Sequence, residues 1–107
     1  MKNVLIATGI AVLFISSTAF AEGDAAAGKS KAAVCAACHG PDGNSQSPMF
    51  PTIAGQHGDY LVKALEDYKS GARKNPIMNG QVAALSKQDM EDLAAYFSSQ
   101  QGLSVKY

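Results

Sequence analysis

Residues 35–39 read Cys35-Ala36-Ala37-Cys38-His39, a pair of cysteines followed directly by a histidine. Two cysteines at this spacing can each form a thioether with one of the two vinyl groups of haem, and the adjoining histidine is then placed to bind the iron. The sequence therefore predicts one covalently attached haem c, with Cys35 and Cys38 as the attachment points and His39 as an iron ligand.

The same pair of cysteines is compatible with three other kinds of site. They could form a redox-active disulfide, half of a zinc site or a structural disulfide. A zinc site needs four ligands, and beyond Cys35, Cys38 and His39 the remaining candidate is His57. A thioredoxin-like disulfide belongs in a βαβ unit, whereas the alanine-rich surroundings here favour helix. Haem attachment is the interpretation that we favour, and the redox-active disulfide is its main rival.

The first 21 residues predict an export signal. Lys2 is followed by an uncharged apolar run over residues 4–15, and small residues stand at Ala19 and Ala21. A basic start, a short apolar run and an Ala-x-Ala ending are typical of a cleavable secretory signal, so we expect cleavage after Ala21. The run is shorter than the roughly 20 residues that a membrane-spanning helix needs, and an uncleaved anchor is the minor alternative.

Residues 22–107 are then expected to form one small domain. We expect this domain to work in an oxidising compartment, namely a bacterial periplasm. A domain of this size buries little apolar surface, and a buried haem would supply the missing core. Without Lys2, eight basic residues stand against nine acidic ones. This near-neutral balance argues against nucleic acid or an anionic membrane surface as a partner, and we expect no stable membrane insertion after the leader is removed.

The remaining pattern predicts three main helices. The first runs from Asp24, a good N-cap, through an alanine-rich segment to about Ala37. The others cover residues 58–70 and the segment that begins at Ser86 and ends at Gly102, and each has an apolar stripe at helical spacing. These stripes are Leu61, Val62, Ala64, Leu65 and Tyr68 in the second helix and Met90, Leu93, Ala94 and Phe97 in the third.

The second iron ligand decides between electron transfer and ligand chemistry. Met90 lies at core-packing spacing, Met49 fits a loop-packing role, and His57 precedes a helix, where a solvated or capping histidine is common. Met78 lies in an expected loop over residues 72–85 and can approach the other haem face. We favour Met78, and the other three remain alternatives. Histidine and methionine together would saturate the iron.

In the expected loop over residues 72–85, Arg73 and Lys74 are candidates to neutralise a haem propionate. We interpret both as solvated cations.

These residues resemble class I c-type cytochromes, in particular the single-domain cytochrome c553 and c5 carriers and one half of the dihaem cytochrome c4 proteins. The matching pieces follow the family order and cover nearly all of residues 22–107. They are residues 23–29 (GDAAAGK), 35–40 (CAACHG), 50–56 (FPTIAGQ), 75–78 (NPIM) and 93–97 (LAAYF).

The resemblance implies an all-α cytochrome c fold wrapped around one haem, in which Gly28 lets the first and last helices cross closely. It also implies that the carbonyl of Pro51 accepts a hydrogen bond from the ring N–H of His39, and that Ile53 presses on the haem. Many relatives carry an aromatic residue about a turn before the attachment site, where this chain has residues 31–33 (KAA).

We therefore expect a soluble periplasmic electron carrier with one haem c, monomeric and not an enzyme, that meets membrane or soluble redox partners briefly. The first alternative is a haem c ligand sensor or peroxidase-type enzyme, which requires an iron that Met78 leaves open. The second is a thiol-disulfide oxidoreductase, which requires two titratable thiols and no haem.

Overall fold

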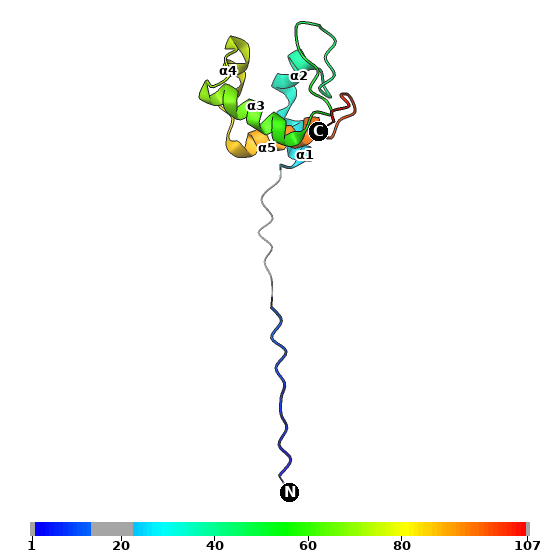
Figure 1. Cartoon of the computed structure of the whole chain (residues 1–107), viewed down its shortest axis with the longest axis vertical. Helices are drawn as coiled ribbons and strands as arrows, with labels where there is room; N and C mark the ends of the chain where they lie inside the picture. The colour runs from blue at the N-terminus through cyan, green and yellow to red at the C-terminus, as the bar shows by residue number, and fades with distance from the viewer. Residues whose placement is uncertain (1, 14–22, 107) are drawn as a thin grey trace.

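The computed structural model describes residues 2–13 and 23–106, and within these ranges it contains five helices and no strand. Figure 1 shows the helices gathered into one body. The expected all-α fold is confirmed, although the helices are more numerous than the three expected. They are α1 (Ala25–Lys31), α2 (Ala33–His39), α3 (Gly58–Ser70), α4 (Pro76–Val82) and α5 (Lys87–Ser98).

Helices α1 and α5 cross at Gly28, which is buried. A Cβ built on Gly28 would lie 2.0 Å from the backbone carbonyl oxygen of Asp92 and 2.8 Å from Cβ of Tyr96. Only glycine allows the two backbones to approach this closely. The expected crossing at Gly28 is therefore confirmed.

Asp24 caps α1, because its carboxylate accepts hydrogen bonds from two backbone N–H groups of the first turn.

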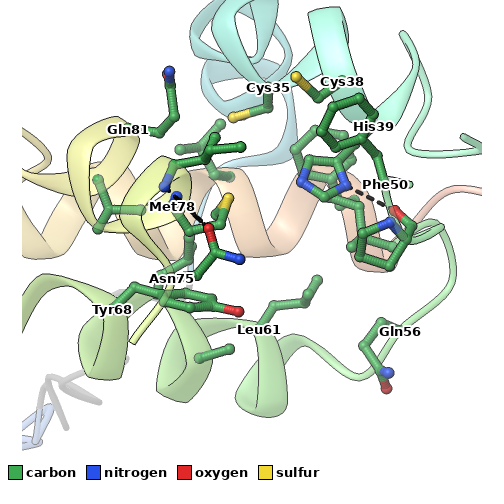
Figure 2. A pocket seen from close by; sticks show the side chains of 18 of the residues that line it. Cys35, Cys38, His39, Phe50, Gln56, Leu61, Tyr68, Asn75, Met78 and Gln81 are labelled. Atoms are coloured by element: carbon green, nitrogen blue, oxygen red, sulfur yellow. Dashed lines mark hydrogen bonds between the residues drawn. The ribbon is translucent and has the colours of Figure 1, made fainter. Parts of the chain in front are cut away.

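The first expected helix is in fact two helices. Ala32 separates α1 from α2, and i→i+3 hydrogen bonds from Ala32 N–H to Lys29 and from Cys35 N–H to Ala32 tighten the chain there. The break lets α1 lie across α5 while α2 carries residues 35–39 to one side of a pocket (Figure 2). Because alanines lie on both sides of the break, helix propensity predicts none.

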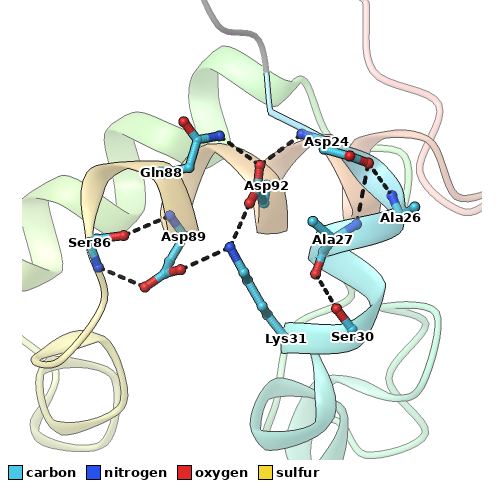
Figure 3. Close-up of polar contacts among 9 residues, drawn as sticks. All are labelled: Asp24, Ala26, Ala27, Ser30, Lys31, Ser86, Gln88, Asp89 and Asp92. Atoms are coloured by element: carbon cyan, nitrogen blue, oxygen red, sulfur yellow. Dashed lines mark hydrogen bonds and ion pairs between the residues drawn. The ribbon is translucent and has the colours of Figure 1, made fainter.

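A polar cluster joins α1 to α5 (Figure 3). Helix α1 contains no aromatic residue. Asp92 is 3% exposed, and its Oδ1 accepts hydrogen bonds from the backbone N–H of Asp24 and from Gln88, each at 2.8 Å. Its Oδ2 lies 2.6 Å from Nζ of Lys31, which also lies 2.9 Å from Asp89. These hydrogen bonds, that of Lys31 above all, lower the pKa of Asp92 to about 2. We call these five residues the Asp92 cluster.

The core lies where α3 packs on α5. Both expected apolar stripes contribute to it, and α3 has the bounds expected for the second helix. Gly71 ends α3 in the left-handed conformation, with φ 85°. The buried residues of this core are Ala32, Leu61, Leu93, Ala94, Tyr96 and Phe97, with Val62 and Leu65 packed against them.

The expected loop over residues 72–85 contains a helix, α4, and the loop prediction is wrong there. Asn75 is its N-cap, since Oδ1 of Asn75 accepts hydrogen bonds from the backbone N–H groups of Ile77 at 3.0 Å and Met78 at 3.1 Å. Pro76 opens the first turn, where its missing N–H costs nothing. Asparagine followed by proline is thus a helix start signal. Met78 lies on a helix and not in a loop.

The third expected helix is α5, which ends at Ser98 and not at Gly102. Its capping box is complete. The Ser86 hydroxyl accepts a hydrogen bond from the backbone N–H of Asp89, and the Asp89 carboxylate accepts one from the backbone N–H of Ser86. Beyond Ser98 the Gln100 N–H donates to the Phe97 carbonyl at 3.2 Å, and the chain then folds back so that the Leu103 N–H donates to the Ala54 carbonyl at 2.7 Å.

The segment over residues 40–57 is irregular and is tied to the end of α5. The backbone N–H of Gly55 donates to the carbonyl oxygen of Phe97 at 2.9 Å. Gly43 has a φ of 88°, and a Cβ there would lie 2.8 Å from the Phe97 ring, so glycine alone fits. These contacts fix the loop that carries Pro51.

Residues 2–13 form neither helix nor strand, and large apolar side chains such as Val4 and Leu5 are exposed. Residues 14–22, which include the expected cleavage point after Ala21, lie outside the described residues. In the part of the chain that the structure describes, no helix is both long and apolar enough to cross a membrane.

Candidate functional site

A cavity of about 340 Å³ lies among α2, α3, α4 and α5, and Figure 2 looks into it. This volume is in the range of small-molecule and cofactor sites. Much of its wall is apolar, with Leu61, Leu65, Val82, Leu93 and Phe97 among the lining residues. The six residues that we favour for the site, Pro51 and Ile53 among them through the resemblance, all line this one cavity. They are Cys35, Cys38, His39, Pro51, Ile53 and Met78.

Cys35 and Cys38 stand three residues apart on α2, and this spacing places both on the face that borders the cavity. The two thiols are free and half-buried. Burial, and to a lesser degree the charge of Cys38, raises the pKa of the Cys35 thiol. Reactive cysteines of disulfide oxidoreductases have lowered pKa values, so this environment disfavours thiol exchange.

His39 is the last residue of α2 and is 8% exposed. Its Nδ1 lies 2.7 Å from the carbonyl oxygen of Pro51, which is the contact that the resemblance implies. A carbonyl oxygen can only accept, so the proton must be on Nδ1. The lone pair of the neutral ring is then on Nε2, which points into the cavity (Figure 2).

Met78 enters the cavity from α4, on the side opposite His39 (Figure 2). Met90 is 4% exposed in the core and does not line the cavity, which fits its expected packing role. His57 stands at the N-cap position of α3 and lines a separate surface pocket. Met49 does line the cavity, but its side chain is 82% exposed, so the expectation that it packs within the loop is wrong.

Arg73 also lines the cavity, although the sequence interpretation treats it as a solvated cation. Its guanidinium lies 4.8 Å from the centroid of the Tyr68 ring, and Nη1 donates a long hydrogen bond of 3.5 Å to the Tyr60 hydroxyl. Among the described residues that line the cavity, Arg73 is the only Asp, Glu, Lys or Arg. The sequence offers Arg73 and Lys74 equally as candidates near the cofactor, and only Arg73 lines the cavity, because its place depends on how α3 and the following turn fold.

The zinc alternative finds no support in the described residues. No group of three or more His, Cys, Asp and Glu side chains there is arranged to hold a metal ion. A structural zinc site needs four ligands, and His57, the remaining candidate, lies in the separate pocket.

The chemistry of the donor set fits haem c. Two thiols border one apolar cavity, and an imidazole nitrogen and a thioether sulfur face each other across it (Figure 2). These are the groups that bind the vinyl carbons and the iron of a covalently attached haem.

Comparison with known proteins gives one consistent family. The family model described as Cytochrome c matches residues 25–101. Cytochrome c4 from Pseudomonas aeruginosa is 51% identical over 98 residues, which make up 92% of this chain and 49% of that protein. Cytochrome c-554(548) from Halomonas halodenitrificans is 43% identical over 82 residues, which make up 74% of this chain and 99% of that protein.

A solved structure agrees with these matches. The crystal structure of reduced recombinant cytochrome c4 from Pseudomonas stutzeri superimposes with a TM-score of 0.72 and 54% identity, covering 79% of this chain and 49% of that chain. The chain therefore spans about half the length of the cytochrome c4 proteins that it matches.

Proposed function

Because the chain belongs to the cytochrome c family, whose cofactor is covalently attached haem c, we propose that it is a single-haem electron carrier. Cys35 and Cys38 would hold the haem through thioethers, and His39 and Met78 would bind the iron from its two sides. The sequence contains one Cys-x-x-Cys-His stretch and two cysteines, so we assign one haem to these residues.

The arrangement of His39 and Met78 on opposite sides of one cavity is the observation that carries this proposal (Figure 2). Two protein ligands would leave no position open for oxygen or peroxide, and a methionine ligand raises the reduction potential. This argues for a carrier and against both a ligand sensor and a peroxidase-type enzyme.

Haem c supplies a one-electron redox couple when it is bound. The chain keeps the surroundings of that couple constant. His39 is buried and held by Pro51, and Met78 is held by the N-cap of its helix. The apolar walls of α3 and α5 exclude water from the cavity. Little then needs to rearrange when an electron arrives or leaves.

The partners that we propose are membrane or soluble redox proteins, met by the carrier as a monomer in brief encounters. Four apolar side chains at the cavity are exposed: Val34, Met49, Tyr60 and Ile77. They offer a small apolar contact area beside the cofactor site, and weak redox encounters use interfaces of this small kind.

We also propose that the carrier works in a bacterial periplasm after its first 21 residues are removed. The uncharged apolar run in residues 4–13 supports this, since its large side chains are exposed and contribute nothing to the core. An apolar segment that the fold does not bury fits a segment used for export.

A mass measurement of the purified protein, combined with carbon monoxide binding, tests the proposal. We expect a denaturation-resistant increase in mass by one haem, and no rapid binding of carbon monoxide by the reduced protein. A protein of unmodified mass with two titratable thiols would instead support the thiol-disulfide oxidoreductase. Rapid binding by a haem-containing protein would support the sensor or peroxidase-type enzyme.

A further inference from the structure

The helix that carries Met78 is too short to be stable by itself. α4 spans seven residues, whereas isolated helices shorter than about 12 residues are marginal in water. Four of its seven residues are exposed, and Val82 is its one buried residue. Contacts with the rest of the protein must therefore hold α4, and with it Met78, in place.

Asn79 makes the polar contacts that tie α4 to the end of α3. Its Nδ2 donates hydrogen bonds to the carbonyl oxygens of Tyr68 at 2.7 Å and Arg73 at 3.0 Å. Its Oδ1 accepts a hydrogen bond from the backbone N–H of Asn75 at 2.9 Å. The side-chain amide thus uses its acceptor and both donor directions, and it satisfies a carbonyl in the last turn of α3.

The contacts of Asn79 continue to Met78 through the N-cap. Oδ1 of Asn75 accepts a hydrogen bond from the backbone N–H of Met78 at 3.1 Å. The backbone N–H of Asn75 in turn donates to Oδ1 of Asn79. A chain of hydrogen bonds therefore leads from the end of α3 through Asn79 and Asn75 to Met78. Asn79 is half-buried, which makes the loss of these bonds costly.

We propose that Asn79 is the positioning residue for Met78: it fixes α4 on α3 so that the methionine sulfur stays in the cavity. This proposal rests on the proposed function, in which Met78 binds the iron. Only an amide serves this position well, because the two carbonyl oxygens need a donor and the Asn75 N–H needs an acceptor.

The test compares Asn79→Ala with Asn44→Ala in the full-length haem-loaded protein. Asn44 is a matched control, since its Nδ2 also donates two hydrogen bonds, to the carbonyl oxygen of Gln101 at 2.7 Å and to Asp42 at 2.9 Å, away from α4. The oxidised proteins are titrated with imidazole, which competes with Met78 for the iron, and the methionine-to-iron absorption band is followed. We expect Asn79→Ala to bind imidazole about tenfold more tightly than the unsubstituted protein, and Asn44→Ala to bind it equally.

Asn79→Asp keeps the acceptor for Asn75 and removes the donor to Tyr68 and Arg73, so it is expected to bind imidazole more tightly as well. If Asn79→Ala does not fold well enough to be purified, the imidazole affinity of Asn79→Asp tests the role of Asn79 in its place. Equal imidazole affinity in the unsubstituted protein and the Asn79 variants would overturn the role of Asn79 alone. An unsubstituted protein that lacks the methionine-to-iron band would overturn the proposed function, and the role of Asn79 with it.

Discussion

The carbonyl oxygen of Pro51 accepts a hydrogen bond of 2.7 Å from the Nδ1–H of His39. This bond fixes the ring so that Nε2 is directed into the cavity. A strong acceptor on Nδ1–H also makes the imidazole a better electron donor toward a metal on Nε2. A better donor stabilises oxidised iron, so the contact should lower the reduction potential.

Pro51→Ala tests this contact. The substitution keeps the carbonyl but frees the backbone dihedral that proline restricts, so the acceptor is held less firmly. We expect the reduction potential to rise in an equilibrium redox titration. Pro48→Ala, at an exposed position in the same loop, is the control and should leave the potential unchanged. Equal potentials in all three proteins would refute the role of the Pro51 carbonyl.

Two helical glycines give a paired test of the α1–α5 crossing. Gly28→Ala would place a methyl group 2.0 Å from a backbone oxygen, so the helices must separate, and we expect unfolding free energy to fall by about 3 kcal/mol. A Cβ built on Gly80 meets no atom within 4 Å, so Gly80→Ala should raise the free energy of unfolding by roughly 0.5–1 kcal/mol. Urea unfolding measures both. A Gly28→Ala protein as stable as the unsubstituted one would mean that the crossing is looser than described.

The Asp92 cluster predicts a loss of stability in acid. The pKa of Asp92 is lowered to about 2, chiefly by Lys31, and then by the Asp24 backbone N–H and by Gln88. A carboxyl whose pKa is lower when folded stabilises the protein above its unfolded value of about 3.9, and that contribution is lost as the pH falls toward 2.

Asp92→Asn removes this contribution. We expect the variant to be less stable than the unsubstituted protein at pH 6, and to lose less of its unfolding free energy between pH 5 and pH 2. Urea unfolding at a series of pH values measures both slopes. Parallel curves for the two proteins would contradict the assigned role of Asp92.

Periodicity was enough to predict the parts of the fold that rest on amphipathic helices. Residues 58–70 carry Leu61, Leu65 and Tyr68 on one stripe, and that stripe determines both the existence and the bounds of α3. The break at Ala32 has no such signal, because alanine favours helix on both sides and the break depends on α1 lying across α5.

Other features depend on contacts between residues that are far apart in the sequence, and no local pattern predicts them. Lys31 and Asp92 are 61 residues apart in the chain, so their pairing cannot be read from the sequence. The position of Arg73 in the cavity wall depends in the same way on the fold of α3. α4 is different, since Asn75 and Pro76 form a start signal that the loop prediction overlooked.

Arg73 gives an electrostatic prediction. A cation in the cavity wall disfavours the more positive, oxidised state of a nearby cofactor, so Arg73→Met should lower the reduction potential. The effect should shrink as salt is added, because Arg73 is exposed. Lys74→Met is the control, since Lys74 is exposed and does not line the cavity. A larger shift in Lys74→Met than in Arg73→Met would contradict this assignment.

His39 and Met78 are proposed to bind the iron from its two sides, and the absorption spectrum of the oxidised protein shows whether Met78 is bound. The comparison is among the unsubstituted protein, Met78→Ala and Met49→Ala, because both methionines line the cavity. We expect a methionine-to-iron band in the unsubstituted protein and in Met49→Ala, and its loss in Met78→Ala with the haem still attached. Retention of the band in Met78→Ala, or its loss in Met49→Ala, would mean that Met78 is not the iron ligand as assigned.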